Sequence, residues 1–294
     1  PEIASKLSFP SSRKGKVKDS AAKTQELNFI TVPQIKLGEA IFKNTTAAIS
    51  NFNQNIYLNC LNVDGIIGAN LMRHTLVQID YINKIIRFSD DESKLITSNT
   101  DGFKVPFTTT AQASPHITLK IGTKNYPTCL LDTGYSGFIS IDIEERKKNP
   151  AFNDVTFNEK HGSTTSGLFG LRKVDTTYSI WFGDYHVDTI PLYQAGALTF
   201  EINRNTPLIG NEFMSQYTPT FNWKEKYIFF EPQMKTQVMP QEFPVGLTIS
   251  DGKIVVIWIR TGYEELLDDL ALGDYLLSIN GKDVPTQIDE ADYC

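Results

Sequence analysis

The sequence predicts a mainly β protein built from two related lobes and a third region of different character. Runs rich in Val, Ile, Thr, Phe and Tyr, bounded by Gly, Asn, Asp or Pro, recur along the chain, as at 116–121 and 227–230. Amphipathic helical patterns are few, with candidates at 1–7, 143–148 and 264–270. We therefore expect sheets to form most of the fold.

An internal repeat divides the chain into two lobes. The segment 66–88 matches the segment 208–230 at a constant offset of 142 (208 − 66 = 142). Each copy begins with two apolar residues and a glycine, Ile66-Ile67-Gly68 and Leu208-Ile209-Gly210. A short turn or helix, a strand, a polar turn and a returning strand are then expected. Two copies are too few for a solenoid, so two lobes packed together is the favoured interpretation.

Composition excludes several classes of function. The 294 residues include 28 Lys and Arg against 34 Asp and Glu, a net charge of −6, which argues against nucleic acid as the main partner. The longest apolar run, 254–259, is far shorter than the roughly 20 residues of a membrane span. Three cysteines without CxxC spacing and four scattered histidines indicate neither a disulfide framework nor a metal site. We expect no metal and no cofactor.

One candidate catalytic residue stands at the end of an apolar strand. In Leu130-Leu131-Asp132-Thr133-Gly134 an aspartate follows apolar residues and precedes a glycine that permits a sharp turn. The apolar-apolar-Gly strand ending at Gly210 comes 78 residues later (210 − 132 = 78). This combination resembles the aspartic proteases of the pepsin and retropepsin type, in which that second strand threads beside the Asp-Thr-Gly loop and its glycine allows close backbone approach.

The resemblance implies a two-lobed, acid-protease-like β-barrel fold that hydrolyses peptide or protein substrates. In it Asp132 is a catalytic aspartate, Thr133 a hydroxyl that anchors the loop across the lobe interface, and Gly134 the turn residue. Two carboxylates about 3 Å apart share one proton, so one activates water while the other polarises the peptide carbonyl. Tyr135 stands where the family usually has Ser or Ala, which would reshape the pocket. The residues expected to support the site are Leu208, Ile209, Gly210, Ile66, Ile67 and Gly68.

The partner of Asp132 is expected upstream of this sequence. The repeat offset places its counterpart at position −10 (132 − 142 = −10), ahead of Pro1. We therefore expect the chain to be a fragment that is inactive by itself. Asp64-Gly65 does not supply the missing half, because it maps onto Thr206-Pro207 and is better interpreted as a turn before a strand.

A segment rich in glycine and small polar residues, 161–170, lies between the motif and Gly210. In the family that the chain resembles, a hairpin in this region closes over the substrate, and such lids need flexible, hydrogen-bonding residues. A plain surface loop is the alternative. The candidate substrate-binding residues here are Gly162, Ser163, Thr164 and Gly167.

The C-terminal region resembles a PDZ domain. Its specific part is the run 273–282, in which Gly-Asp makes a turn, alternation fills a strand and Asn280-Gly281 makes a tight hairpin. Val245, Gly246 and Leu247 fit the family loop whose backbone amides receive a peptide carboxylate, while the peptide adds a strand to the sheet edge. The helix that forms the other wall of the groove is expected to continue past Cys294, so the domain would be incomplete.

Together the resemblances predict three units: the remainder of a first lobe at 1–100, a second lobe at 101–236 and a partial PDZ domain at 237–294. They imply an aspartic endopeptidase of the bacterial cell envelope, periplasmic or secreted, whose PDZ domain binds C-terminal peptides or regulates access. Two alternatives remain. One is a non-catalytic peptide-binding or scaffold protein, and the other is a homodimer in which each copy supplies one aspartate. The part of the first lobe that is present argues against the homodimer, because it already occupies the face on which a second copy would pack.

Overall fold

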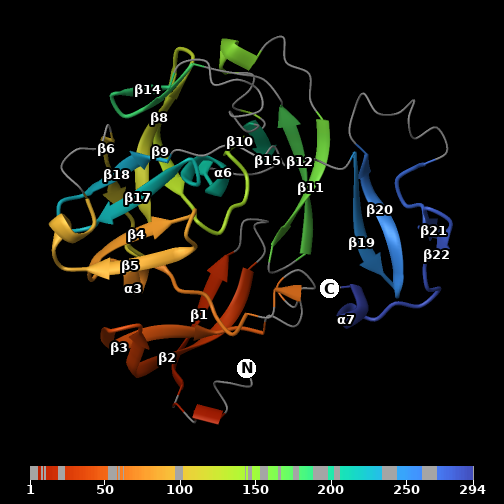
Figure 1. Ribbon diagram of the computed structural model, residues 1–294, viewed down its shortest axis with the longest axis horizontal. Coiled ribbons are helices and arrows are strands. Elements are labelled where there is room, and N and C mark those ends of the chain that lie inside the picture. Colours follow the sequence, from red (N-terminus) through yellow and green to blue (C-terminus); the bar gives the residue numbers. More distant parts are fainter. Residues whose placement is uncertain are drawn as a thin grey trace.

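The computed structural model describes residues 1–294 with the exception of 1–5, 8, 10, 19–23, 52–57, 59, 62, 97–101, 143, 145–147, 153–157, 165–166, 175–178, 188–197, 202–205, 234–243, 260–269 and 294. The described part is mainly β, as the sequence predicts, with strands in five sheets and only short helices (Figure 1). No helix in that part has the length and hydropathy of a bilayer-spanning segment. The helix candidates at 1–7, 143–148 and 264–270 lie largely outside it.

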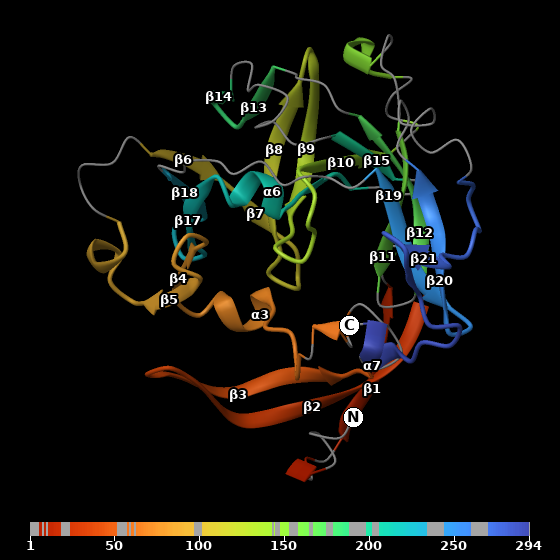
Figure 2. The ribbon, with the colours of Figure 1, turned by 45° about the vertical axis from the view of Figure 1, so that its right-hand side comes forward.

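The first sheet is an antiparallel meander of three strands near the N-terminus. Its strands are β1 (Ser11–Lys18), β2 (Thr24–Leu37) and β3 (Ala40–Ile49), in that order. Helix α3 (Ala69–Met72) lies against β3, and the side-chain amide of Asn70 donates to the carbonyl of Thr46 at 2.9 Å. Figures 1 and 2 both show β2 and β3 below α3. The meander therefore contacts the first copy of the repeat through α3.

The largest sheet holds the strand that leads into the Asp132 loop and the first strand of the second copy of the repeat, β16. Its order is β11-β12-β15-β10-β16-β9-β8-β13-β14, with β7 paired to β8, and only the β10–β15 and β16–β9 pairs are parallel. The strands are β7 (Thr108–Thr109), β8 (Pro115–Ile121), β9 (Lys124–Leu131), β10 (Ile139–Asp142), β11 (Asn158–Thr164), β12 (Gly167–Val174), β13 (Ile180–Phe182), β14 (Tyr185–Val187), β15 (Leu198–Glu201) and β16 (Leu208–Ile209). A short 3-10 turn, η3 (Pro150–Phe152), follows β10 in the chain.

A five-stranded sheet combines strands from both copies. Its order is β5-β4-β17-β18-β6, so the two hairpins of the repeat stand side by side with β4 against β17 (Figure 1). The strands are β4 (Leu76–Asp80), β5 (Ile85–Ser89), β6 (Phe103–Pro106), β17 (Tyr217–Asn222) and β18 (Tyr227–Pro232). A 3-10 turn, η2 (Glu92–Lys94), follows β5. This sheet is where the two copies meet.

The repeat seen in the sequence is also a repeat in space. Helix α3 follows Gly68, and the matching helix α6 (Asn211–Met214) follows Gly210. The turns after β4 and β17 each hold a lysine in the left-handed conformation, Lys84 at φ 55° and Lys226 at φ 60°. These positions are 142 apart, like the strands that flank them. The predicted order of short helix, strand, polar turn and returning strand is confirmed in both copies.

The register of the central pair of strands makes this repeat twofold. Gln78 of β4 lies opposite Thr220 of β17 in an antiparallel pair, and these residues are equivalents because 220 − 78 = 142. When equivalent residues face each other across an antiparallel ladder, the two strands are related by a local twofold axis through that pair. The two copies of the repeat are thus related by rotation about the middle of the five-stranded sheet.

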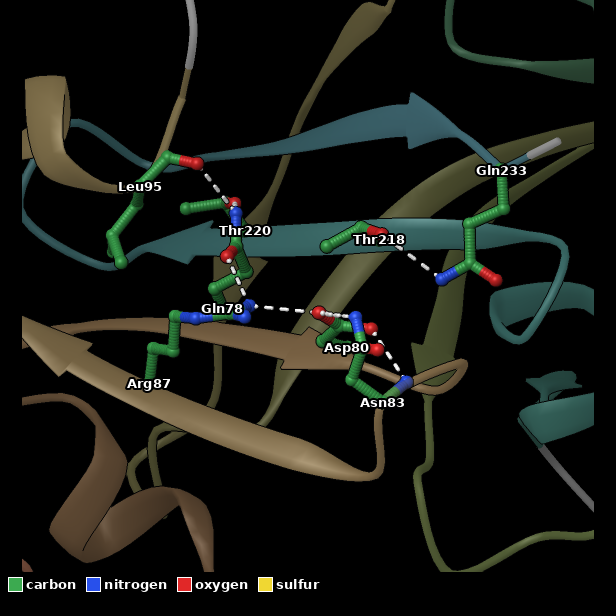
Figure 3. Close-up of polar contacts among 8 residues, drawn as sticks. All are labelled: Gln78, Asp80, Asn83, Arg87, Leu95, Thr218, Thr220 and Gln233. Atoms are coloured by element: carbon green, nitrogen blue, oxygen red, sulfur yellow. Dashed lines mark hydrogen bonds and ion pairs between the residues drawn. The ribbon is translucent and has the colours of Figure 1, made fainter.

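One face of this sheet carries a buried polar network (Figure 3). The amide nitrogen of Gln78 donates to Thr220 Oγ1 at 3.0 Å and to the carbonyl of Leu95 at 2.6 Å. Arg87 donates to Gln78 Oε1 at 3.0 Å and to Asp80 Oδ2 at 2.9 Å. Buried polar groups are costly unless they are paired, so this network fixes the register of the strands that carry it.

The opposite face joins the two larger sheets through one hydrophobic core. Val77, Phe221 and Phe230 of the five-stranded sheet belong to the same buried cluster as the apolar residues of β8, β9 and β10. Phe213 of α6 lies within this cluster, and its ring stacks on Phe182 at 4.2 Å between centroids. Burying an aromatic ring of this size stabilises the fold by roughly 1.5–3 kcal/mol. The packing of Phe213 therefore fixes α6 and the residues just before it.

The C-terminal region forms two small hairpins. Their strands are β19 (Val245–Ser250) with β20 (Lys253–Ile259), and β21 (Ser278–Ile279) with β22 (Lys282–Asp283), followed by α7 (Glu290–Tyr293). Asn280 and Gly281 have φ values of 52° and 76°, so the tight Asn-Gly hairpin predicted from the sequence is confirmed. Strand β20 lies beside β11 (Figures 1 and 2).

The cysteines differ from the expectation drawn from their number and spacing. Cys60 takes part in a disulfide, whereas Cys129 is a buried free thiol on β9. Pairing requires that two cysteines approach closely in the folded chain, and sequence spacing alone does not encode that proximity.

Candidate active site

The Asp132 loop begins where β9 ends. Leu130 and Leu131 pair in parallel with Leu208 and Ile209 of β16, and the backbone N–H of Asp132 donates to the carbonyl of Ile209 at 2.9 Å. The side chain of Leu131 is buried in the core, and the chain leaves the sheet directly after it, at the end of β9. The candidate catalytic aspartate is thereby held by main-chain bonds to the strand that the sequence predicted beside it.

A tight turn directs a backbone donor at the carboxylate. The N–H of Gly134 donates to Asp132 Oδ1 at 2.8 Å, and the N–H of Tyr135 donates to the carbonyl of Asp132 at 3.1 Å. Asp132 itself is half-buried, while Thr133 and Gly134 are exposed. A carboxylate held in this way has a fixed orientation and still reaches solvent, as a group that activates water requires.

Gly210 has no room for a side chain. A Cβ at this position would lie 2.3 Å from the carbonyl oxygen of Gly137 and 2.4 Å from that of Tyr135. Its φ of −113° is ordinary, so the requirement for glycine is steric rather than conformational. The N–H of Gly210 also donates to the carbonyl of Phe138 at 2.9 Å. The loop and the strand threaded beside it are therefore in backbone contact, the arrangement expected from the sequence.

Asn211, the first residue of α6, ties the loop to the first copy of the repeat. Its backbone N–H donates to the carbonyl of Tyr135 at 2.8 Å, and its side-chain amide donates to the carbonyl of Thr133. Tyr81, in the turn after β4, donates its hydroxyl to Asn211 Oδ1 at 2.6 Å. The described contact of Thr133 is made by its carbonyl, and the role expected for its hydroxyl stays a prediction.

Neither Tyr81 nor Asn211 was singled out by the sequence reasoning. The signal was present in the repeat, as a difference between its copies: Tyr81 is matched by Trp223, and Asn211 is matched by Ala69.

The first copy presents the same apolar-apolar-Gly segment in a different environment. Residues 65–68 belong to no strand. Ile66 and Ile67 have exposed fractions of 69% and 42%, whereas their counterparts Leu208 and Ile209 have fractions of 2% and 0%. The difference arises because Leu208 and Ile209 are covered by β9 and β10. Ile66 and Ile67 therefore form an exposed apolar surface next to α3.

The candidate lid residues lie at the end of a hairpin. Gly162, Ser163 and Thr164 of β11 pair with the first residues of β12, and Thr164 faces Gly167 across the last pair. The first copy holds a comparable hairpin, β1–β2, which the sequence reasoning missed. Strand β2 begins 44 residues before Gly68, and β12 begins 43 residues before Gly210 (68 − 24 and 210 − 167). A hairpin therefore precedes the repeat glycine by a similar number of residues in both halves of the chain.

The candidate carboxylate-binding residues are strand residues rather than loop residues. Val245, Gly246 and Leu247 lie in β19 and pair with β20, with a register irregularity between Gly246 and Leu247. Leu247 lies opposite Val256, whose N–H and carbonyl bond to residues on the far side of β20. The carbonyl of Leu247 accepts a hydrogen bond from the hydroxyl of Tyr293 at 3.0 Å. Tyr293 of α7 thus meets β19 at its outer edge.

Comparison with known proteins gives a limited result. No protein-family model and no curated protein matches the chain. Among solved structures it is similar to a retropepsin-like aspartic protease from Rickettsia conorii, with 9% identity, a TM-score of 0.32, and coverage of 46% of this chain and 94% of that one.

Proposed function

We propose that this chain belongs to an aspartic peptidase and supplies one of its two catalytic carboxylates, Asp132. The observation that carries the proposal is the twofold relation between Gln78 and Thr220 in the five-stranded sheet. A loop related to the Asp132 loop by the same axis would face it, and two facing carboxylates are what this chemistry needs. The substrate class is peptides or proteins.

The second carboxylate is proposed to come from a loop that packs on Ile66 and Ile67. Residues 1–294 contain one Asp-Thr-Gly and no Asp-Ser-Gly, so this loop lies outside them. The exposed apolar surface of Ile66 and Ile67 supports this assignment, since their counterparts are covered by the strand that carries Asp132. Residues 1–294 by themselves are expected to be inactive.

The chemistry follows from two carboxyl groups that share one proton. The ionised group takes a proton from a water molecule as the water oxygen attacks the peptide carbonyl carbon, and the protonated group donates to the carbonyl oxygen. The tetrahedral intermediate then breaks its C–N bond as the nitrogen receives a proton. The products are a carboxylic acid and an amine. In this scheme the Gly134 N–H holds Asp132 in place for both steps.

The other units are assigned accessory roles. The hairpin that contains Gly162, Ser163, Thr164 and Gly167 is proposed to close over bound substrate. Residues 237–294 are proposed to be a partial PDZ domain that binds peptide C-termini along β19 or regulates access. The protein is proposed to be periplasmic or secreted, a location that rests on the resemblance to envelope proteases.

The test is hydrolysis of a protein substrate by the complete protein. Asp132→Asn is expected to abolish turnover, and a statine-type transition-state mimic is expected to block the wild type. Asp64→Asn, which changes an exposed turn aspartate, is the matched control and is expected to retain activity. Turnover that survives in Asp132→Asn would exclude this role for the residue. A wild type that binds peptides without cleaving them would favour the scaffold alternative.

A further inference from the structure

We propose that Tyr81 is a positioning residue that orients the Asp132 carboxylate from the first copy of the repeat through a continuous chain of hydrogen bonds. The chain runs from the Tyr81 hydroxyl to the Asn211 side chain, then to the Thr133–Gly134 peptide group, and ends on Asp132 Oδ1. The catalytic consequence rests on the proposed function, but the chain of hydrogen bonds can be tested without it.

The chemistry of the groups fixes the direction of every bond. The carbonyl of Thr133 can only accept, so the Asn211 atom that faces it must be the amide nitrogen. The other atom of the amide, Oδ1, then faces Tyr81, whose hydroxyl must donate. Burial raises the pKa of Tyr81 to about 12, so the hydroxyl keeps its proton at any working pH. Each donor therefore points toward the carboxylate.

One peptide group connects Asn211 with Asp132. The carbonyl that Asn211 holds and the N–H that reaches Asp132 Oδ1 belong to the same planar unit, between Thr133 and Gly134. Rotation of that unit would break both bonds together. Hydrogen bonds that share a polarised peptide also strengthen one another. Loss of the Tyr81 bond is thus expected to weaken the bond from Gly134 to Asp132.

The residues equivalent to Tyr81 and Asn211, each in the other copy of the repeat, do not form the same series of hydrogen bonds. Trp223, the counterpart of Tyr81, donates its indole N–H to the carbonyl of Ala113 at 2.9 Å and is buried among aromatic rings. Ala69, the counterpart of Asn211, has no amide to relay a bond. Among the described residues, the first copy therefore holds the Asp132 loop, and the positions equivalent to Tyr81 and Asn211 form no matching chain of hydrogen bonds.

The first experiment observes the Gly134 amide by NMR in the complete protein labelled with ¹⁵N-glycine. The Gly134 signal is assigned as the one that disappears from the spectrum of the Gly134→Ala variant. Tyr81→Phe, which removes one oxygen atom and keeps the ring, is expected to move the Gly134 proton upfield because its bond to Asp132 weakens. Tyr227→Phe is the matched control, since it removes a hydroxyl of β18 that bonds to Glu92 of η2, away from the Asp132 loop. A Gly134 resonance that Tyr81→Phe leaves in place, or that Tyr227→Phe moves equally, would overturn the proposal whether or not the protein is a peptidase.

Kinetics give the second readout where turnover is observed. Tyr81→Phe is expected to lower kcat about 2- to 10-fold with KM unchanged, the effect of one hydrogen bond that matters for the reacting geometry. Asn211→Ala is expected to lower kcat further. Adding Tyr81→Phe to Asn211→Ala should then cost nothing more, because the chain is already broken. Additive losses would show that Tyr81 acts by another route. Absence of turnover in the wild type would count against the proposed function alone, since the Gly134 resonance is independent of it.

Discussion

Gln78 and Thr220 are equivalent residues of the two repeats, and they meet at the centre of the five-stranded sheet with a hydrogen bond of 3.0 Å between Gln78 Nε2 and Thr220 Oγ1. Both side chains are buried. Although the positions are equivalent, the residue types differ, and the Gln78 amide donates to the Thr220 hydroxyl across the twofold axis.

The hydrogen bond between Gln78 and Thr220 at the twofold axis predicts a measurable loss of stability in Thr220→Val. Valine matches threonine in volume but removes the hydroxyl, leaving the Gln78 amide with Leu95 as its remaining acceptor. The free energy of unfolding is expected to fall by about 1 kcal/mol, measured by urea denaturation. Thr118→Val, an exposed strand position, is the control and should change little. Equal stability of wild type and Thr220→Val would show that the hydroxyl makes no net contribution.

The two repeat glycines predict unequal effects of the same substitution. Gly210→Ala places a Cβ against two backbone oxygens that cannot withdraw without moving the Asp132 loop. At Gly68 a Cβ would meet only the side-chain oxygen of Asn70 at 3.0 Å, which can rotate away. We expect Gly210→Ala to cost about 1–3 kcal/mol or more and to abolish turnover, with Gly68→Ala much milder in thermal unfolding. Similar melting temperatures for the two variants would contradict the steric argument.

The Asp80 network predicts a pH-dependent stability difference. Hydrogen bonds from Asn83 hold the pKa of Asp80 below its usual value, and Arg87 lowers it further. A depressed carboxyl pKa stabilises the fold above the unfolded-state value of about 3.9, and the contribution disappears as pH falls through the folded-state pKa. Asp80→Asn should therefore lower the melting temperature at pH 7, and the gap to the wild type should narrow below about pH 4.

The carboxylate of Glu231 partly offsets the stabilisation that the Asp80 carboxylate provides, because the two negative charges repel each other. Burial raises the pKa of Glu231, and the Asp80 charge raises that pKa further. Asp80→Asn therefore removes part of the charge repulsion on Glu231. Asp184→Asn, at an exposed turn, controls for the change in net charge. A gap between Asp80→Asn and the wild type that is constant from pH 7 to pH 3 would show that the loss is one of packing rather than of charge.

Cys129 is predicted to resist modification in the folded protein. Its side chain is fully buried on β9, and burial raises the pKa of the thiol well above its usual value. The thiolate is the reactive form, so alkylation requires unfolding. Mass spectrometry after iodoacetamide treatment should find the Cys129 peptide unmodified in buffer and modified in urea. Rapid labelling under native conditions would mean that β9 opens readily.

Local sequence patterns predicted individual strands and turns, whereas the contacts between distant segments depend on the tertiary fold and could not be predicted in this way. Alternating apolar residues marked 116–121 as a strand because one side of it faces the core, and Asn280-Gly281 marked a hairpin because of its backbone preferences. The contact from Tyr81 to Asn211 spans 130 residues and depends on how two hairpins pair. No local propensity encodes such a contact. The Cys60 disulfide was missed for the same reason.

The twofold register has a consequence for how such a sheet assembles. A strand pair in which equivalents face each other can be made by two copies of one hairpin, so a chain with a single copy would build the same sheet by dimerising. Here both hairpins lie on one chain, 142 residues apart, and their encounter is intramolecular. Its effective concentration is set by the connecting chain rather than by the amount of protein in solution. Dilution, which separates a dimer, leaves this pairing intact.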